Sequence, residues 1–425
     1  MDSQSSAPLL LDISRLVWSA RRTGPSGIDR VELAYAEYFL GAESRRPAYA
    51  VVHLMGWIFA MNPASARRFI QKISARWHGG SSEGNAGRAP GVLGVYAMLL
   101  SGRWMAGLEL RLRLKRYRQP PIFLVVSHHH LSLDYTIRRI RRSFRARCVC
   151  FLHDLIPIEY PEYVQPNRER RHRLATRTIT RVVDAVIVNS KTTAYGFRQY
   201  LLSEFEPGTR VPNMHVALPG VRAFPYQQGA QPLSSEMSSV PYFIVLGTIE
   251  PKKNHLMLLN LWARFSADKV NAPRLLVIGA RGWENEQVVD MLERSRRLRG
   301  LVEEHNHMDD AAIGTLLKQA RALLMPSITE GFGLPVAEAL ASGVPVICSD
   351  IAAFREVGGE VPEYLDPLDL FGWRNVIIEY SRVDSERRAA QLERMARWRA
   401  PQWSDHFEVV ENALDEVAKS DGVLE

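Results

Sequence analysis

The chain has 425 residues, and at roughly 150 residues per domain this length predicts two or three domains with ordinary cores. Hydrophobic residues make up 46% and charged residues 24%, which is typical of globular proteins and excludes a disordered or fibrous chain. The three cysteines form no CxxC pair, so a disulfide framework or zinc cage is not expected, and a reducing, cytoplasmic setting is favoured.

The formal net charge of +8 and the isoelectric point near 9.4 predict attraction to an anion: nucleic acid, phospholipid headgroups or a phosphorylated ligand. The basic residues are clustered. Residues 103–118 hold six basic residues and one acid, and residues 138–147 hold six arginines and no acid. The N-terminus lacks the basic region of a signal peptide, and the longest nearly apolar run, residues 49–61, is too short to span a bilayer.

Short β-branched runs alternate with helical patterns along the chain, which predicts parallel α/β layers. The expected strands are, in order, residues 8–12, 48–53, 122–127, 148–153, 185–189, 214–218, 242–247, 274–279, 322–326 and 344–349. Helices are expected between them, among others at residues 27–39, 256–265, 311–320 and 336–341.

A stretch rich in Ser, Gln, Pro and Gly predicts an interdomain linker at residues 226–240. It separates an N-terminal Rossmann-like domain (1–225) from a C-terminal one (241–400), which a C-terminal helix (401–425) follows. Such doubly wound domains bind ligands at the carboxyl ends of their strands, so we expect them to face a central cleft. An insertion at about 62–120 ends in a basic, partly apolar stretch, 92–118, which fits either a membrane-associating helix or a solvated helix packed on the domain.

The most informative motif runs from Ile328 through Thr-Glu-Gly-Phe-Gly-Leu-Pro-Val-Ala to Glu338. Glu330 and Glu338 are separated by seven residues, the glycines between them permit a tight turn, and Pro335 suits the first turn of a helix. Backbone amides at such a helix start bind anions and hydroxyls, and carboxylates accept hydroxyls of sugars and riboses. The residues that we expect to contact a ligand here are Glu330, Gly331, Phe332, Gly333, Leu334 and Glu338.

This string resembles the EX7E motif of retaining glycosyltransferases of family 4, which have the two-domain GT-B fold. The resemblance extends over nearly the whole chain in order, and its Gly-Trp segment is similar to bacterial polysaccharide mannosyltransferases. Its further pieces are Asp12-Ile-Ser-Arg with Gly24-Pro-Ser-Gly-Ile-Asp-Arg, Leu152-His-Asp-Leu-Ile-Pro, Val186-Ile-Val-Asn-Ser, Leu218-Pro-Gly-Val, Gly247-Thr-Ile-Glu-Pro-Lys-Lys-Asn and Ile278-Gly-Ala-Arg-Gly-Trp.

Two glycines and a lysine are predicted to face the donor diphosphate. Gly27 lies at an expected strand-to-helix turn, and the resemblance implies that Gly24 and Gly27, and more weakly Asp29, approach the diphosphate and the acceptor. Lys253 follows an expected strand and precedes a helix that Asn254 is predicted to cap, so its ammonium would neutralise a departing diphosphate.

The cations around Lys253 depart from the family pattern. Thr248 stands where many members of the family carry an arginine, and Lys252 or Arg281 is the candidate replacement. We expect Thr248, Lys252 and Arg281 to line the donor site with Lys253.

His153 ends an expected buried strand, and the resemblance places it beside the donor sugar as a catalytic residue, together with Glu330 and Lys253. Asp154 would either orient the imidazole or cap the next helix. No metal-ligand spacing appears, so no metal and no cofactor are expected, and the pair Asp309-Asp310 is predicted to cap a helix. The run His128-His129-His130 fits a metal site, the acceptor side of the cleft or plain loop polarity.

The arginine clusters lack the aromatic interleaving of a nucleic-acid module, so we expect no nucleic acid. The remaining interpretations of the arginine clusters are solvated helix faces, contact with membrane headgroups and contact with a lipid-linked diphosphate acceptor.

The resulting hypothesis is a retaining, metal-independent hexosyltransferase that acts in the cytoplasm at the inner membrane. It would transfer mannose from GDP-mannose, with UDP-hexoses or a deoxy sugar as alternative donors, to a lipid-diphosphate-linked saccharide, and the nucleotide sugar is the donor substrate. The resemblance implies that the N-terminal domain binds the acceptor, that the C-terminal domain binds the nucleotide sugar, and that the final helix (401–425) crosses back to the N-terminal domain. Rival hypotheses are a nucleotide-sugar epimerase or hydrolase on the same fold, and a non-catalytic protein that binds an anionic ligand or a membrane.

Overall fold

The computed structural model describes residues 6–20, 24–42, 44, 46–54, 57–78, 104–105, 107–128, 130–226, 240–268, 272–306 and 308–420. The chain divides into two compact units. Unit 1 comprises residues 1–155, 170–219 and 404–425, and unit 2 comprises residues 156–169 and 220–403. Residues 227–239 of the predicted linker and residues 92–103 and 106 of the basic stretch lie outside the described residues.

Unit 1 is built on an eight-stranded sheet with the order β4-β3-β2-β1-β5-β6-β7-β8. Its strands are β1 (Leu9–Asp12), β2 (Ala48–Leu54), β3 (Trp57–Met61), β4 (Trp104–Met105), β5 (Ile122–Val125), β6 (Arg147–Leu152), β7 (Ala185–Val188) and β8 (Asn213–Val216). Strands β2, β1 and β5 to β8 are parallel, whereas β3 and β4 extend the edge antiparallel. The central strands are buried on both faces, as a parallel sheet covered by helices requires.

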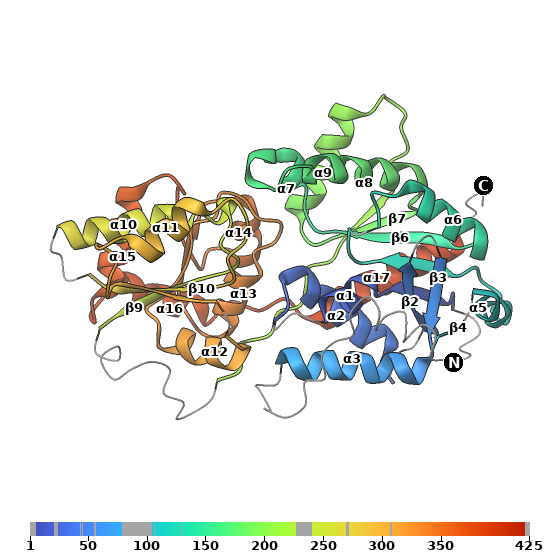
Figure 1. Ribbon diagram of the computed structural model, residues 1–425, viewed down its shortest axis with the longest axis horizontal. Coiled ribbons are helices and arrows are strands. Elements are labelled where there is room, and N and C mark those ends of the chain that lie inside the picture. Colours follow the sequence, from blue (N-terminus) through green and yellow to red (C-terminus); the bar gives the residue numbers. More distant parts are fainter. Residues whose placement is uncertain are drawn as a thin grey trace. The chain divides into compact units, whose positions relative to one another are not determined.

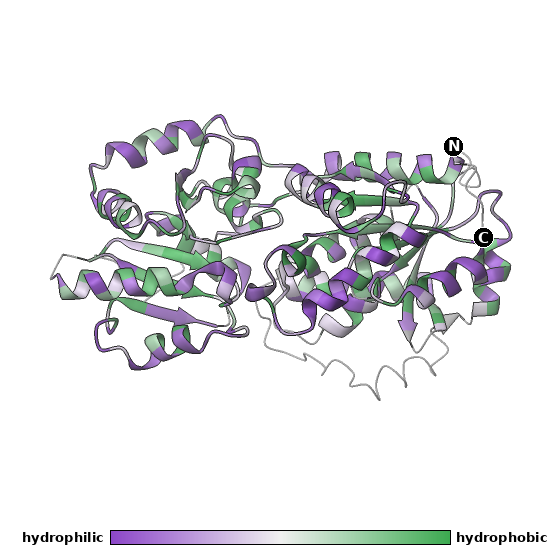
Figure 2. Ribbon diagram, turned by 90° about the horizontal axis from the view of Figure 1, so that it is seen from above, coloured by the Kyte–Doolittle hydropathy of each residue, from purple (hydrophilic) through white to green (hydrophobic). Residues whose placement is uncertain are grey.

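The helices of unit 1 follow the strands in the alternation that the sequence predicts. They are α1 (Ser14–Ser19), α2 (Gly27–Leu40), α3 (Pro63–His78), α5 (Gly107–Leu114), α6 (Asp134–Phe144), α8 (Arg168–Val182), α9 (Lys191–Glu204) and α17 (Trp403–Lys419). Figure 2 shows hydrophilic and hydrophobic residues along the same helical ribbons, which is the pattern of helices with one face on a sheet.

Helix α17 is part of unit 1 although the segment before it belongs to unit 2. Arg46 forms ion pairs with Glu411, at 2.8 Å, and with Asp415 on this helix. The His406 ring has Nε2 at 2.9 Å from the Tyr35 hydroxyl and Nδ1 at 3.1 Å from the carbonyl oxygens of Ala217 and Leu218. The helix therefore closes the core of unit 1 with both apolar and polar contacts.

Unit 2 contains a six-stranded, fully parallel sheet with the order β11-β10-β9-β12-β13-β14. Its strands are β9 (Tyr242–Leu246), β10 (Arg274–Ile278), β11 (Val302–His305), β12 (Leu323–Met325), β13 (Val346–Ser349) and β14 (Glu363–Leu365). Its helices are α7 (Ile156–Glu159), α10 (His255–Ala267), α11 (Glu286–Arg294), α12 (Asp310–Gln319), α13 (Leu334–Ala341), α14 (Ala352–Gly358), α15 (Leu370–Ser381) and α16 (Glu386–Met395), with short 3₁₀ turns at Pro161–Tyr163 and Pro251–Lys253.

Both units are thus α/β folds with mainly parallel sheets and helical crossovers (Figure 1), which confirms the fold class predicted for each half of the chain. Asp309 caps α12 by accepting a hydrogen bond from the Ala312 amide at 2.8 Å, as predicted. In the part of the chain that the structure describes, no helix combines the length and the apolar composition that crossing a bilayer needs.

Replacing His406 is predicted to flatten the pH dependence of the stability of unit 1. Burial lowers the pKa of His406 to about 4, although the two carbonyl groups oppose this shift. The unfolded chain, with a histidine pKa near 6.5, takes up a proton between about pH 6.5 and pH 4 that the folded chain does not, so stability falls as the pH is lowered through this window. His406→Gln is expected to remove up to about 1.4 kcal/mol per pH unit from that slope. Urea unfolding measured across the window tests this, and equal slopes for both proteins would contradict it.

Candidate active site

The candidate site of unit 2 lies at the carboxyl edge of its parallel sheet. Strands β9, β10 and β12 are neighbours, and the residues that follow them are Gly247, Gly279 and the segment from Pro326 to Glu330. Gly279 has a φ of +158°, and a Cβ there would lie 2.0 Å from the carbonyl oxygen of Gly247. The ends of β9 and β10 therefore approach more closely than any side chain at Gly279 would allow.

The structure brings two of the predicted catalytic residues together, although they are 77 positions apart in the sequence. The Lys253 ammonium lies 2.5 Å from Oε1 of Glu330, and Lys252 lies 3.4 Å from Oε2 of the same carboxylate. Ser327 donates a hydrogen bond of 2.9 Å to Glu330, and Lys252 also lies 3.4 Å from Glu250. Two lysines and two glutamates thus form one compact cluster.

The cluster keeps Glu330 ionised. Burial alone would raise the pKa of Glu330, but the ammonium groups of Lys252 and Lys253, with hydrogen bonds from Lys253 and Ser327, lower that pKa to about 2. Burial raises the pKa of Glu250, against the effect of the same two lysines. An anionic ligand that entered the cluster would therefore meet the ammonium groups of Lys252 and Lys253, which already face the ionised carboxylate of Glu330.

The EX7E turn is bonded directly to the lysine segment. The amide of Ile328 donates to the carbonyl oxygen of Lys252 at 2.8 Å, so the loop after β12 runs beside the turn that carries Lys252 and Lys253. Gly333, at a φ of +96°, is the N-cap of α13, and Pro335 lies in the first turn. Glu338 lies one turn inside the helix, as the sequence predicts. Phe332 is buried beneath the loop.

The prediction that Asn254 caps α10 is correct for its position but wrong for its side chain. Asn254 occupies the N-cap position, but its side chain makes no capping hydrogen bond. Its side-chain amide instead donates to the carbonyl oxygens of Pro326, at 3.2 Å, and Pro367, at 3.0 Å, and its backbone is left-handed with a φ of +57°. Asn254 therefore fixes the lysine turn against the loop that leads to Glu330.

Arg281, a candidate for the missing family arginine, is held by acids of its own. Its guanidinium contacts both oxygens of Glu304, at 2.8 and 2.7 Å, and Glu293 at 2.6 Å. These contacts compete with any diphosphate for the same donors. Thr248 lies in the turn after β9, where its methyl group is next to Gly282. In the structure, Glu330 forms ion pairs with Lys252 and Lys253.

His153, the third predicted catalytic residue, lies in unit 1 directly after β6 and is buried. Its Nε2 lies 2.7 Å from the carbonyl oxygen of Val126, an acceptor, so Nε2 carries the proton and Nδ1 is an acceptor. Burial lowers the pKa of His153 to about 4, which keeps the ring neutral near pH 7. The ring stacks edge-on with His128 at 5.3 Å, and the Asp154 carbonyl oxygen lies 2.9 Å from Nε2 of His172.

The glycine loop of unit 1 ends in a capping box. Ser26 caps α2 and exchanges hydrogen bonds with Asp29, which also forms an ion pair of 2.8 Å with Arg15. Gly27 is the first residue of the helix, and Gly24 has open space around the position of a Cβ. Asp29 is buried, so its contacts are those of a helix start.

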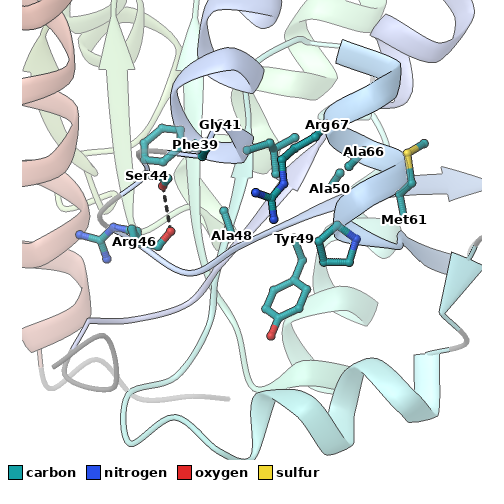
Figure 3. Close-up of a pocket in the computed structure, with 13 residues that line it drawn as sticks. Phe39, Gly41, Ser44, Arg46, Ala48, Tyr49, Ala50, Met61, Ala66 and Arg67 are labelled. Atoms are coloured by element: carbon teal, nitrogen blue, oxygen red, sulfur yellow. Dashed lines mark hydrogen bonds between the residues drawn. The ribbon is translucent and has the colours of Figure 1, made fainter. Parts of the chain in front are cut away.

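A pocket of about 220 Å³ opens in unit 1 near the starts of β2 and α3 (Figure 3). It is lined by Phe39, Leu40, Gly41, Ala42, Ser44, Arg46, Ala48, Tyr49, Ala50, Met61, Pro63, Ala66 and Arg67. None of the predicted site residues lines it, and it lies at the amino-terminal end of β2, where parallel α/β folds do not place their ligands.

Sequence reasoning missed Ser327, Glu250 and Asn189 as members of the polar clusters. Ser327 lies three residues before Glu330 at a strand end, which is the signal that could have identified it. Asn189, at the end of β7, donates 2.7 Å to the carbonyl oxygen of His153. Polar residues at the carboxyl ends of adjacent buried strands were the pattern to look for.

Residues 234–360 match the family model of the glycosyl transferases group 1. The whole cluster from Gly247 to Glu338 lies inside this range. This part of the chain is thus similar to the group 1 glycosyltransferases, which confirms the resemblance predicted from the EX7E string.

Among curated relatives, the chain is 32% identical to the O-antigen chain mannosyltransferase B of Escherichia coli over 164 residues, which are 39% of this chain and 43% of that protein. It is 27% identical to the serotype-specific mannosyltransferase WbdA of Escherichia coli over 220 residues, 50% of this chain and 27% of that protein. The chain spans less than half of the length of these relatives.

A solved structure supports the fold over nearly the full chain. The Anabaena protein HepE, crystallised in complex with UDP and glucose, covers 96% of this chain and 100% of its own, with a TM-score of 0.63 at 16% identity. This likeness confirms the predicted GT-B fold class.

Proposed function

We propose that this protein is a retaining glycosyltransferase that moves mannose from GDP-mannose to a saccharide acceptor during bacterial polysaccharide synthesis, and that this acceptor is lipid-diphosphate-linked. The group 1 domain and the relatives named as O-antigen mannosyltransferases support the transfer and the sugar. The donor is a substrate in this proposal, and unit 1 supplies the acceptor side.

The observation that carries the proposal is the contact of Lys252 and Lys253 with Glu330 beside the start of α13. Ammonium groups and exposed amides at a helix N-terminus are the groups that stabilise a diphosphate. A carboxylate with its pKa held near 2 accepts hydroxyl hydrogen bonds from a ribose or a hexose at any pH near neutrality. One compact cluster thus offers both kinds of contact that a nucleotide sugar needs.

The chemistry follows from that arrangement. The bond between the anomeric carbon and the phosphate oxygen breaks with its electron pair on the oxygen, so positive charge develops on the carbon and negative charge on the diphosphate. Lys252 and Lys253 stabilise the negative charge. The acceptor hydroxyl attacks the anomeric carbon from the same face, and its proton passes to the departing phosphate oxygen, which removes the need for a separate protein base.

Nucleotide binding provides the direct test. Thermal unfolding is measured with GDP-mannose, GDP, UDP-glucose, UDP and no ligand, because a ligand that binds only the folded state raises the melting temperature. The expected result is the largest increase with GDP-mannose and GDP, and its loss in Glu330→Ala. A larger shift with UDP-glucose would contradict the choice of mannose, and no shift with any nucleotide would contradict the enzyme assignment.

Product analysis distinguishes transfer from the rival reactions. Isotope-labelled GDP-mannose is incubated with and without a lipid-extracted saccharide acceptor, and the label is followed by mass spectrometry. Transfer predicts label in the saccharide only when acceptor is present. Free mannose or an epimerised nucleotide sugar formed at the same rate without acceptor would show a hydrolase or an epimerase.

A further inference from the structure

All of the excess positive charge of this chain lies in two short segments, residues 107–118 and 134–145, called here the basic segments. Together they hold ten basic and two acidic residues, a net charge of +8. This equals the net charge of the whole chain, so the remaining residues are balanced. A charge distribution of this kind is an electrostatic footprint rather than a general property of the surface.

The fold brings the two basic segments to one region of unit 1. Helix α5, in the first segment, contacts β3 and β4. The guanidinium of Arg111 on α5 lies over the ring of Phe144 on α6, at 5.6 Å from its centroid. Arg139 on α6 lies over the ring of Trp57 on β3 at 4.6 Å and donates to the Tyr135 hydroxyl at 2.9 Å. Strand β3 and helices α5 and α6 thus share one surface.

Large apolar side chains are exposed on the same elements. Trp57 is 61% exposed, Leu108 69%, Leu112 56% and Tyr135 64%. Leu108 and Leu112 lie one helical turn apart on α5, while Leu110 and Leu114 are buried beneath them. These exposed side chains, which contribute nothing to the core, alternate with arginines and lysines.

Part of the positive charge is already neutralised. Glu109 pairs with Arg113, Asp134 with Arg138, and Arg141 reaches Asp184. Arg111, Lys115 and Arg142 are exposed and have no carboxylate within ion-pair distance among the residues that the structure describes. The surface therefore presents cations that a partner can still neutralise.

We propose that β3, α5 and α6 dock this protein on an anionic lipid bilayer, with Trp57, Leu108 and Leu112 entering the interface and Arg111, Lys115 and Arg142 meeting the headgroups. Exposed tryptophan and leucine side chains gain free energy at the boundary between headgroups and acyl chains, and basic residues add attraction to anionic lipids. A nucleic-acid backbone would also attract the arginines but gives the exposed leucines no apolar environment. The mixture of both residue types favours the bilayer.

The electrostatic part is tested with the full chain and vesicles of phosphatidylcholine, with or without about one-third phosphatidylglycerol. Arg111→Glu, Lys115→Glu and Arg142→Glu are combined in one variant. Because each basic residue near an anionic surface contributes about a factor of five to partitioning, the variant is expected to bind anionic vesicles at least roughly 100-fold more weakly. Raising the salt concentration is expected to weaken the wild type but to change the variant little.

A matched control carries the same change in net charge elsewhere. Arg296, Arg297 and Arg299 of unit 2 are exposed, and their combined change to Glu is expected to leave vesicle binding within about threefold of the wild type. Equal losses in both triple variants would show that total charge, not this surface, drives binding, and would overturn the proposal. Circular dichroism checks that each variant is folded.

The contribution of the exposed apolar side chains is tested separately. Leu108→Ser with Leu112→Ser, which keeps every charge, is expected to lower binding to anionic vesicles about 10-fold. Anionic vesicles are expected to shift wild-type tryptophan emission to the blue, and Trp57→Phe to remove most of that shift. Binding of a double-stranded RNA oligonucleotide by the wild type but not by the α5–α6 triple variant, with equal vesicle binding by both, would assign the surface to nucleic acid instead.

The outcome is independent of the proposed enzyme activity. None of the substituted residues belongs to the candidate active site, so the variants are expected to keep donor binding in solution. Loss of vesicle binding with unchanged nucleotide-dependent melting supports the docking surface alone, whereas failure of every nucleotide to bind would affect only the proposed function.

Discussion

Replacing Lys253 by alanine is expected to lower the rate of sugar transfer by 10²- to 10³-fold, with little change in fold. The Lys253 ammonium is the group closest to Glu330, at 2.5 Å, and in our proposal it stabilises the negative charge that develops on the departing diphosphate. Loss of one such preorganised charge partner costs about 3–4 kcal/mol of transition-state stabilisation. The rate is measured with saturating donor and acceptor by mass spectrometry of the product.

Two comparisons separate the role of Lys253 in catalysis from its role in structure. Lys253→Ala leaves the buried Glu330 carboxylate short of one partner, which itself costs stability. The double variant Lys253→Met with Glu330→Gln removes both charges, and it is expected to regain stability but not turnover. Lys318→Ala on the exposed face of α12 is the matched control and should be neutral in both respects. Transfer within threefold of wild type in folded Lys253→Ala would remove this residue from the mechanism.

Gly279→Ala is expected to destabilise unit 2 by about 3 kcal/mol or more and to abolish nucleotide binding. The added methyl group would lie 2.0 Å from the Gly247 carbonyl oxygen, so backbone rather than a flexible side chain would have to move. Gly247 in turn faces Lys253, whose Cε lies 3.6 Å from the position of a Cβ there. A shift of the β9 end therefore displaces the lysine turn. Urea unfolding, followed by the fluorescence of the buried Trp262 and Trp373, measures the loss.

Gly300→Ala provides the corresponding control. Gly300 also has a positive φ, +72°, but nothing lies within 4 Å of the position of its Cβ. Its replacement is expected to cost only about 1 kcal/mol of backbone strain and to leave nucleotide binding intact. Equal losses for the two alanine variants would mean that backbone conformation, and not the contact with Gly247, makes Gly279 necessary.

Most of the strands that could be predicted from the sequence are buried on both faces, and β8, whose residues are exposed or half-buried, is an exception. Strands β1, β5 to β7, β9, β10 and β12 read as continuous apolar runs because helices cover both faces of a parallel sheet. The edge strands β11 and β14 escaped prediction because Glu303, Glu304 and Glu363 give them the polar character that exposed edges carry. Strand β3 was missed since its residues continue the apolar run of β2, which instead pairs with it antiparallel.

The candidate site was predictable where chemistry and local geometry coincide in one segment. The turn at Gly333, the proline in the first turn and the position of Glu338 all follow from a single string. Contacts between residues that lie far apart in the sequence could not be predicted in this way. Contacts of Glu330 with Lys252, and of Arg281 with Glu304, depend on strand order, which spacing along the chain does not encode.

The construction of unit 1 from three separate stretches has a consequence for biosynthesis. Tyr35 and Arg46, made early, depend on α17, which follows unit 2 in the sequence, for the contact with His406 and for the ion pairs with Glu411 and Asp415. The core of unit 1 therefore stays incomplete on the ribosome until α17 has been synthesised, by which point all of unit 2 has already been made. A stop codon at the start of α17 would therefore damage the half of the protein that was synthesised first.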